Sequence, residues 1–367
     1  MDDSMSAKES AIERGEVLVL TTAEVSGLVG AADCVDVIDA VLREPAALSQ
    51  QTLPRRRLYM PVEGEESEYY WHNNMAGAFL GRGTLAVRLD VSRTRIREER
   101  QEFPGDFTGL VLLYDLATSH PYAIIHDHGL SPLRVAATSA VATRELAPSG
   151  SSVLGIIGTG EQARAHALTH RVAMPGLTTI LYYSRSADNR DRAAAASESE
   201  TGIEAVGVGS VEELIARSHV VIAATNATEP VFDGHSLQPG QHLVSLASSD
   251  GFAQRREIDE TSIERSDLIV VNSKTQIIAD RQGHYGSPSS VEDLHHIVEL
   301  TDVLSGRAPG RTSDEQITLY DNNVGMGIQF AALGALTFEK AVAAGLGTPL
   351  PADLFVTRKS AGELYAP

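Results

Sequence analysis

Short apolar runs dominate the first third of the chain, and most of them have the pattern of strands. Glycine, proline and charged residues separate the runs, as in a meander or a mixed sheet. The highly charged stretch 93–106 is predicted to be a solvated connection. The predicted strands are residues 57–62, 68–72, 84–91, 108–114 and 121–126.

After residue 134 the pattern changes, because strand-like runs now alternate with helical ones. An alanine-rich helix is predicted over residues 135–146, and a long, mostly apolar helix over residues 325–345. Strands that alternate with helices favour a parallel sheet with helices on both of its faces. The strands predicted in this part are residues 153–157, 177–183, 219–225, 242–247 and 268–272.

A glycine-rich turn follows the strand predicted at residues 153–157. Gly158 would allow a sharp turn, Gly160 would let a pyrophosphate approach the backbone, and Ala163 would let the next helix pack on its strand. The free N–H groups of the first helical turn would face the phosphates. The sequence therefore predicts a dinucleotide-binding unit. Its turn consists of Gly158, Thr159, Gly160, Glu161, Gln162 and Ala163.

The second strand of this unit ends where the ribose of the cofactor is normally recognised. An acidic residue there would accept hydrogen bonds from a 2′-hydroxyl, whereas Ser184 and Arg185 can donate to a 2′-phosphate. Arg190 is a further candidate for this contact. We therefore expect NADP(H) as the preferred cofactor, with NAD(H) possible. The alternative is that Arg185 is only a solvated loop arginine.

Composition and charge restrict the class of protein. The 367 residues suggest about two domains, and the formal net charge of −19 argues against nucleic acid or an anionic membrane as the partner. Cys34 is the single cysteine and is expected in the core. His126-Asp127-His128 has no third ligand at a recognisable spacing, so no metal site is predicted. We expect a cytoplasmic protein, because neither a signal-peptide core nor an apolar run of ~20 residues is present.

The order and spacing of five stretches resemble the ornithine cyclodeaminase/mu-crystallin family, over about residues 17–350. The resemblance implies an α/β fold, with a Rossmann-type dinucleotide-binding domain over residues 134–321. This domain would be inserted into a mixed α+β substrate-binding and dimerisation domain, residues 1–133 and 322–367, and the family forms dimers. Thr225 becomes a further candidate for the cofactor site. The five stretches are residues 57–62, 134–143, 158–163, 224–231 and 306–311.

The resemblance also assigns substrate contacts. Arg57 and Arg134 match the two arginines that grip the substrate carboxylate, and each guanidinium can make two parallel charge-assisted hydrogen bonds. The alternative is that either arginine only pairs with a surface carboxylate. Arg88 stands where the family has its active-site lysine. It can still hold a carboxylate, but it stays protonated and is a poor proton shuttle.

Two residues are candidates for the proton transfer. The family aspartate near the substrate nitrogen falls on Ser249 counted from one side and on Gly251 counted from the other, so Asp250 between them is the first candidate. His72 is the second. The alternatives are an exposed loop aspartate and a structural histidine. Gln329 stands where relatives usually carry an acidic residue, which is expected to alter the pocket beside the nicotinamide.

These features predict an NADP(H)-dependent oxidoreductase that acts on the C–N bond of a small amino or cyclic imino acid. The reaction would be that of a ketimine or pyrroline-2-carboxylate reductase, or of an amino-acid dehydrogenase. Arg57, Arg88 and Arg134 would hold the carboxylate, and Asp250 or His72 would handle the proton. One alternative is an ornithine or lysine cyclodeaminase that releases ammonia and recycles its cofactor. The other is a non-enzymatic protein of the mu-crystallin kind that binds NADPH and a small ligand.

Overall fold

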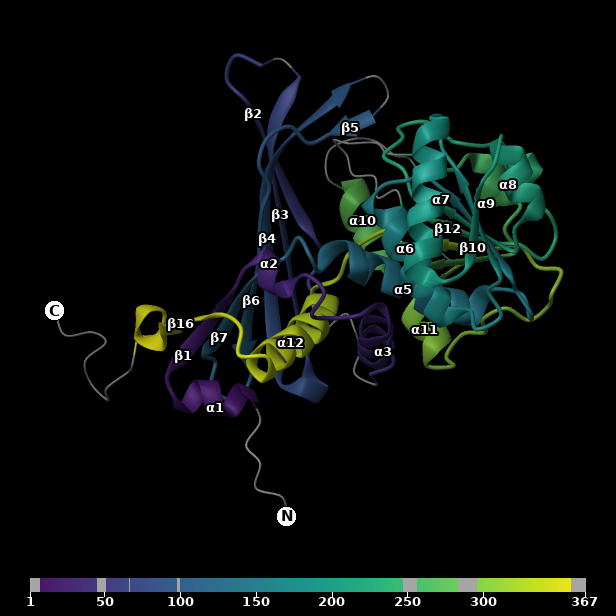
Figure 1. Cartoon of the computed structure of the whole chain (residues 1–367). Helices are drawn as coiled ribbons and strands as arrows, with labels where there is room; N and C mark the ends of the chain where they lie inside the picture. The colour runs from purple at the N-terminus through teal and green to yellow at the C-terminus, as the bar shows by residue number, and fades with distance from the viewer. Residues whose placement is uncertain are drawn as a thin grey trace.

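The computed structural model describes residues 7–44, 51–65, 67–97, 100–246, 256–282 and 296–357. Within them the chain forms two eight-stranded sheets, each packed against helices (Figure 1). The two halves lie side by side, and residues of both line a common pocket (Figure 1). This is the α/β class that the sequence predicts.

The first sheet combines the N-terminal part of the chain with the last strand. Its order is β16-β1-β7-β6-β4-β3-β2, with β5 on the side of β4. Neighbours are antiparallel except for β1 and β7. The five predicted strands are present, and two of them, β3 and β4, extend well beyond their predicted ends. The strands are β1 (Glu16–Leu20), β2 (Arg56–Pro61), β3 (Glu68–Phe79), β4 (Thr84–Arg97), β5 (Arg100–Glu102), β6 (Thr108–Asp115), β7 (Pro121–His126) and β16 (Thr348–Pro351).

The stretch 93–106 is not the solvated connection that we expected, because the end of β4 and all of β5 lie within it. Arg95 donates from Nε to Glu102 at 2.7 Å and from Nη1 to Glu68 at 3.0 Å. Thr94, next to it in β4, is buried and accepts a hydrogen bond from Gln101. Ion pairs between strands therefore continue the sheet through a segment whose charge suggested exposure.

Helix α12 (Gly327–Ala343) covers the inner face of the first sheet and matches the predicted apolar helix. Its N-terminus touches β3, since a Cβ atom on Gly327 would lie 2.0 Å from the carbonyl carbon of Ala76. A Cβ atom on Gly77 would likewise lie 2.3 Å from the backbone nitrogen of Ile328. Glycine at both positions brings the first turn of α12 to the floor of the site described below. The other helices of this half are α1 (Ala7–Glu13), α2 (Thr22–Val25) and α3 (Ala31–Leu42), and α3 buries Cys34 as expected.

The second sheet is parallel throughout, with the order β10-β9-β8-β11-β12-β15-β13-β14. From β8 the chain proceeds outward first on one side and then on the other, which is the doubly wound arrangement of Rossmann folds. Ligands of such sheets bind at the carboxyl edge where the order reverses, here between β8 and β11. The strands are β8 (Val153–Ile157), β9 (Thr179–Tyr183), β10 (Glu204–Gly207), β11 (Val220–Ala223), β12 (His242–Ser245), β13 (Leu268–Val271), β14 (Ile297–Glu299) and β15 (Thr318–Asp321).

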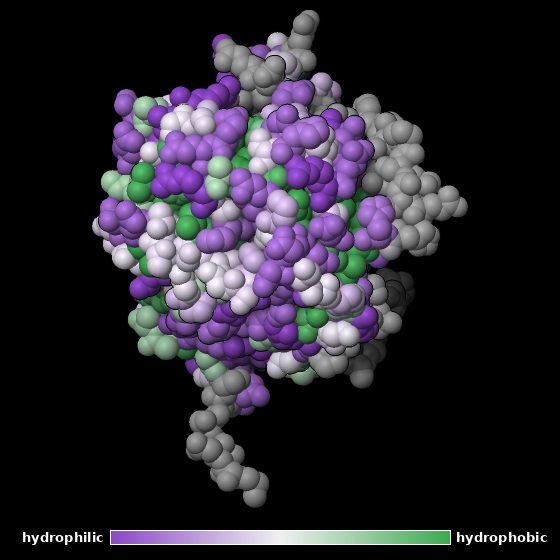
Figure 2. All heavy atoms as spheres, turned by 90° about the vertical axis from the view of Figure 1, so that its right-hand side faces the viewer, coloured by the Kyte–Doolittle hydropathy of each residue, from purple (hydrophilic) through white to green (hydrophobic). Residues whose placement is uncertain are grey.

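Helices pack around the second sheet, and the face of the molecule that they present is largely hydrophilic (Figures 1 and 2). The predicted domain division at residue 134 falls inside α5, and the one at residue 322 directly follows β15. No helix in the described part of the chain is both long and apolar enough to cross a membrane. The helices are α5 (Ser131–Leu146), α6 (Glu161–Ala173), α7 (Ala187–Thr201), α8 (Val211–Arg217), α9 (Glu260–Glu264), α10 (Lys274–Gln282) and α11 (Leu300–Leu304).

Candidate active site

A cavity of about 860 Å³ lies at the carboxyl edge of the parallel sheet, over the switch between β8 and β11. Its walls come from the glycine-rich turn, the end of β9 and the segment after β11. The structure therefore brings together eight of the ten residues predicted to bind the cofactor, the exceptions being Ala163 and Arg190. These eight are Gly158, Thr159, Gly160, Glu161, Gln162, Ser184, Arg185 and Thr225.

The turn has the geometry that a pyrophosphate requires. Gly158 has a φ of 121°, and a Cβ atom there would lie 2.3 Å from the carbonyl oxygen of Ala224. Gly160 is the N-cap of α6, no side chain caps this helix, and a Cβ atom on Gly160 would meet nothing within 4 Å. The N–H groups of the first turn are thus left for an anion, and Ala163 is buried against the core behind them.

The end of β9 supplies the two residues predicted to recognise a 2′-phosphate. Arg185 is exposed at the rim of the cavity, and Ser184 lies next to it. Arg190 does not line the cavity: its Nη1 donates to the carbonyl oxygen of Ser184 at 3.0 Å, and its guanidinium stacks on Tyr183, 5.8 Å from the ring centre. Arg190 therefore supports the loop instead of facing the ligand.

Thr225 is held in place by a buried carboxylate that the sequence did not reveal as important. Its Oγ1 donates to Oε1 of Glu257 at 2.8 Å, and its backbone N–H donates to the same oxygen. The other carboxylate oxygen accepts from the backbone N–H of Leu246 at 2.9 Å. Glu257 also acts on Asp321, the last residue of β15. Burial, and to a smaller extent the negative charge of Glu257, raise the pKa of the Asp321 carboxyl group to about 7. Glu257 thus fixes the segment after β11 at the edge of the cavity.

A second hollow of about 530 Å³ adjoins the cofactor cavity, since Glu161, Gln162 and Thr225 line both. The first sheet and the start of α5 form its other walls. All three predicted carboxylate-binding arginines are present in this pocket. The residues from this side include Arg55, Arg57, Trp71, Asn73, Met75, Arg88, Asp90 and Arg134.

Arg134 is buried in the first turns of α5, and its guanidinium lies over the ring of Phe330 at 5.1 Å. Nη1 donates to Oε1 of Gln329 at 3.3 Å, and a Cβ atom on Gly325 would lie 2.3 Å from Nη1. Burial, followed by repulsion from Arg88, lowers the pKa of Arg134 to about 9. Within the described residues no carboxylate forms an ion pair with this guanidinium. Gln329 is fully buried beneath the guanidinium of Arg134, so Gln329 acts on the pocket through Arg134.

Arg57 lies near the mouth of the pocket. It is half-buried, and its guanidinium stacks over the indole of Trp71 at 5.2 Å from the ring centre. In the sheet register Arg57 pairs with Asn73 of β3, which pairs in turn with Asp90 of β4. Three polar side chains of one face of the sheet therefore reach the pocket side by side.

Arg88 lines the pocket, but two aspartates engage it. Its Nε donates to Oδ2 of Asp127 at 2.6 Å, and its Nη2 lies 2.9 Å from Oδ2 of Asp90. Arg88 is only 4% exposed, so these pairs lie away from water. The structure therefore does not support our expectation that Arg88 holds the substrate carboxylate, because its donors are directed at buried carboxylates of the chain itself.

His72 lies on the opposite face of β3 from Trp71 and Asn73, because successive strand residues point to opposite sides. It does not line the pocket. Its register partners are Leu58 and Val91, which are both exposed, and its Nδ1 lies 3.1 Å from the carbonyl oxygen of Asp90. The expected role of His72 in proton transfer thus finds no support in the geometry.

Asp250, the other candidate for the proton, lies outside the described residues, as do Ser249 and Gly251. Nothing in the structure tests that assignment. The described part of the chain contains no group of three or more histidine, cysteine or acidic residues placed to hold a metal ion.

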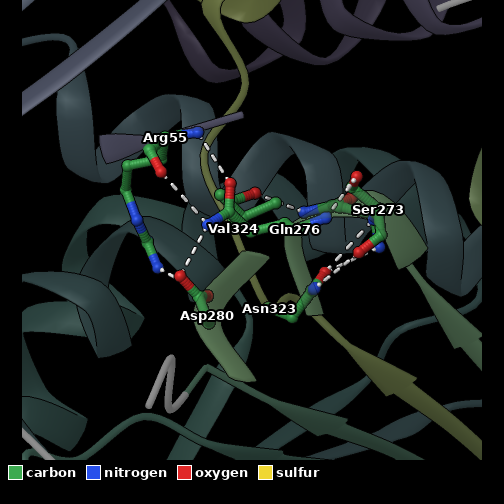
Figure 3. A network of polar contacts seen from close by, with 7 residues as sticks. Arg55, Ser273, Gln276, Asp280, Asn323 and Val324 are labelled. Carbon is green, nitrogen blue, oxygen red and sulfur yellow. Dashed lines mark hydrogen bonds and ion pairs between the residues drawn. The ribbon is translucent and has the colours of Figure 1, made fainter. Parts of the chain in front are cut away.

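A buried network ties the first half of the chain to the second beside the pocket (Figure 3). The backbone N–H of Arg55 donates to Oε1 of Gln276 on α10 at 2.7 Å, and Gln276 donates from Nε2 to Oδ1 of Asp280 at 2.7 Å. Nη2 of Arg55 lies 3.4 Å from Oδ2 of Asp280. Asn323 donates to the carbonyl oxygen of Ser273 at the start of α10. The contacts of Arg55 with α10 fix the two halves relative to each other at the pocket wall, and Asn323 holds the start of α10 in place.

Sequence reasoning missed Asn73, Asp90 and Asp127. A signal for two of them was available, since Asn73 follows Trp71, and Asp90 follows Arg88, at the two-residue spacing of one strand face. Asp127 could not be found in this way, because it comes from the loop after β7 and meets Arg88 only in the folded chain.

Comparisons with known proteins agree with this arrangement. The profile of the ornithine cyclodeaminase/mu-crystallin family matches residues 97–345. The chain is 28% identical over 339 residues to a Delta(1)-pyrroline-2-carboxylate reductase of Bacillus cereus, which covers 90% of this chain and 98% of the relative. It is 26% identical over 231 residues to the ketimine reductase mu-crystallin of Mus musculus, which covers 62% and 68% respectively.

Among solved structures, the Delta(1)-pyrroline-2-carboxylate reductase of Thermococcus litoralis, in complex with NADH and L-proline, has a TM-score of 0.75 and 26% identity. That comparison covers 90% of this chain and 99% of the other. The family profile spans more than half of the sequence, and the turn and arginines that suggested the resemblance converge on one site. The chain belongs to the ornithine cyclodeaminase/mu-crystallin family.

Proposed function

We propose that the protein is an NAD(P)H-dependent reductase of a small cyclic imino acid, of the pyrroline-2-carboxylate or ketimine type. The observation that carries the proposal is Arg134, a buried guanidinium that lines the pocket and has no carboxylate partner in the described part of the chain. A charge removed from water is costly unless an opposite charge joins it. The carboxylate of a substrate would supply that charge.

The pocket supports this reaction by its position and size. A carboxylate on Arg134, with Arg57 at the mouth, would orient the adjacent carbon. The hollow of about 530 Å³ has room for a small ring, and it adjoins the cavity that we expect to hold the dinucleotide. The carbon that bears the nitrogen would therefore lie next to the nicotinamide. Relatives named as reductases of pyrroline-2-carboxylate and of ketimines support the same substrate class.

We propose NADP(H) as the preferred cofactor. The N–H groups at the start of α6 would receive the pyrophosphate, and Ser184 and Arg185 would donate to a 2′-phosphate. When bound, the reduced nicotinamide supplies a hydride. The relative from Thermococcus litoralis was solved with NADH, so NAD(H) is the competing cofactor. A cytoplasmic location remains our prediction from the sequence.

The proposal is tested by following nicotinamide absorbance and ammonia together. Purified protein is mixed with NADPH or NADH and with pyrroline-2-carboxylate or piperideine-2-carboxylate, and separately with NADP⁺ or NAD⁺ and ornithine or lysine. We expect oxidation of NADPH with a cyclic imine, and no ammonia from the diamino acids. Ammonia without a net change in nicotinamide would instead identify a cyclodeaminase. Tight binding of NADPH without turnover would identify a non-enzymatic binding protein.

We also propose that two copies of the chain associate through the outer face of the first sheet, as the family resemblance implies. Along β4 the inward residues include Ala86, Arg88 and Asp90, whereas Leu85, Val87, Leu89 and Val91 point outward and are only partly covered, before arginines take over the outward positions of the strand. A group of exposed apolar side chains on one face of a sheet favours a contact with another molecule. A second copy would cover the same apolar strands of its partner. The exposed large hydrophobic residues of this outer face include Leu58, Met60, Tyr70 and Val91.

A further inference from the structure

We infer that Asp90 is the acid that gives a proton to the imine nitrogen of the substrate. This role presupposes the proposed imine reduction, and it adds a catalytic residue that the sequence motifs do not mark. The family lysine is replaced by Arg88, which cannot release a proton near neutral pH. Another group must therefore carry the proton.

Asp90 has the position that this role requires. Its side chain lines the pocket together with Asn73 and Arg57, its neighbours in the sheet register. Asp90 is 3% exposed, and its Oδ1, like Oδ1 of Asp127, is buried and has no hydrogen-bond partner in the part of the chain that the structure describes, but only Asp90 of the two lines the pocket. A buried carboxyl oxygen without a donor indicates either a bound ligand or a proton on the carboxyl group itself.

The second carboxyl oxygen of Asp90 shares its partner with a second aspartate. Arg88 is shared between Oδ2 of Asp90 at 2.9 Å and Oδ2 of Asp127 at 2.6 Å. The two carboxyl groups contact the same guanidinium, and their mutual repulsion favours the protonated form of one of them. Asp127 is fully buried and makes the shorter contact, whereas Asp90 faces the pocket. Asp127 is therefore the inner partner of Arg88, and Asp90 is the carboxyl group of the two that can pass a proton to a ligand.

Gly109 makes this arrangement possible. It pairs with Asp90 in the register of β6 and β4, and a Cβ atom on it would lie 2.1 Å from Oδ1 of Asp127. Any larger residue would push Asp127 away from Arg88, and the second carboxylate would be lost from the pair.

The surroundings of Asp90 also favour the protonated form of its carboxyl group. Burial raises the pKa of Asp90 and the charge of Asp127 adds to the rise, while Arg88, Arg57 and His72 oppose it. The charged and titratable groups that influence Asp90 are Arg57, His72, Arg88, Asp127 and Arg134.

The step balances without a further reactant. The imine carbon accepts a hydride from the reduced nicotinamide and forms a C–H bond. The π electrons of the C=N bond move to the nitrogen, which takes the proton of Asp90 and forms an N–H bond. Asp90 is left as a carboxylate that Arg88 stabilises, the nicotinamide is left oxidised, and water returns the proton to Asp90. Arg88 is a positioning residue in this step.

The variant Asp90→Asn tests the inference, because it keeps the shape of the side chain and leaves Arg88 paired with Asp127. We expect kcat for imine reduction to fall by about 10²–10⁴-fold, the usual contribution of a general acid. The decline of the wild-type rate at high pH should disappear as well. Asp127→Asn should move that decline to lower pH, since removing a neighbouring negative charge favours the ionised form of Asp90. Asp36→Asn, exposed on α3, is the control.

A readout that does not depend on turnover is the infrared spectrum of the complex with NADP⁺ and pyrrole-2-carboxylate, a planar anion that is not reduced. The difference between wild type and Asp90→Asn at neutral pH should contain the carbonyl band of one protonated carboxyl group. Absence of this band would overturn the inference, as would an Asp90→Asn variant with the wild-type rate while Asp250→Asn is inactive. A wild-type protein without activity on any imine would contradict the proposed function instead.

Discussion

Arg134 of α5 donates from Nη1 to Oε1 of Gln329 on α12, across 3.3 Å, beneath the floor of the pocket. The same Oε1 accepts the backbone N–H of Met326 at 3.1 Å, and Nε2 of Gln329 donates to Oγ1 of Thr138 at 2.9 Å. An amide therefore positions the guanidinium without neutralising it. The positive charge of Arg134 is kept for a ligand, which is the basis of the proposed carboxylate site.

Replacement of Arg134 by glutamine should weaken the binding of an anionic ligand far more than it weakens the binding of the cofactor. Charge-assisted hydrogen bonds contribute about 1.5–3 kcal/mol each, so we expect the dissociation constant of pyrrole-2-carboxylate to rise by roughly 10- to 100-fold. Isothermal titration calorimetry measures it with NADP⁺ present. Arg144→Gln, exposed on the same helix, should bind as the wild type does. Equal losses in both variants would remove the evidence for the carboxylate site.

Replacement of Arg185 by serine should change the choice of cofactor. The arginine is exposed at the rim of the cavity, and in the proposed complex it would donate to the 2′-phosphate that NADPH carries and NADH lacks. We expect the dissociation constant of NADPH to rise by about tenfold or more, and that of NADH to stay nearly constant. Fluorescence titration with both cofactors checks this. Arg171→Ser, exposed on α6, is the matched control, and a wild type that prefers NADH would refute the predicted preference.

Aspartate at two positions of the outer sheet face should separate the proposed dimer. Leu58 and Val91 are 58% and 46% exposed, so the double variant Leu58→Asp and Val91→Asp should fold but place charges in the interface. Sedimentation velocity should show a dimer for the wild type and a monomer for this variant. Ile263→Asp, on a residue that is 41% exposed in the other half of the chain, should remain a dimer. A wild-type monomer at high concentration would contradict the proposal.

Three buried histidines should make the fold sensitive to mild acid. Burial lowers the pKa of His166 to about 4 and that of His242 to about 3, and it also lowers the pKa of His170. In the unfolded chain these histidines take up protons as the pH falls through about 6.5, whereas in the folded chain they stay neutral until the pH is much lower. The contribution of these neutral histidines to the free energy of unfolding is therefore fully present above about pH 6.5. It falls as the pH drops toward 4, by about 3 kcal/mol for His166 alone.

Thermal unfolding at several pH values checks this expectation. The variant His166→Gln should lose less stability than the wild type between about pH 7 and pH 5, because it has one fewer group to protonate. His235→Gln serves as the control, since that histidine is 76% exposed in its side chain. The prediction fails if both variants follow the wild-type pH dependence.

The sequence by itself determined the features that depend on short stretches of chain. The strand at residues 153–157, the glycines at 158 and 160, and the helix after them are neighbours in sequence, so their residue types specify the turn and its open N–H groups. The alternation of strands and helices is likewise readable along the chain, so it specified the parallel sheet. Arg57 and Arg134 were found because they occur within recognisable stretches, and both line the pocket.

Only the tertiary structure decided how the charges of the site are shared. The sequence gives no register between strands, so it did not show that His72 faces outward with Leu58 while Asn73 and Asp90 face the pocket. A one-residue change of register reverses the faces of a strand. The contact of Arg88 with Asp127 also joins segments that are far apart in sequence. Such contacts arise when sheets close and helices pack, and a linear pattern of residue types does not contain them.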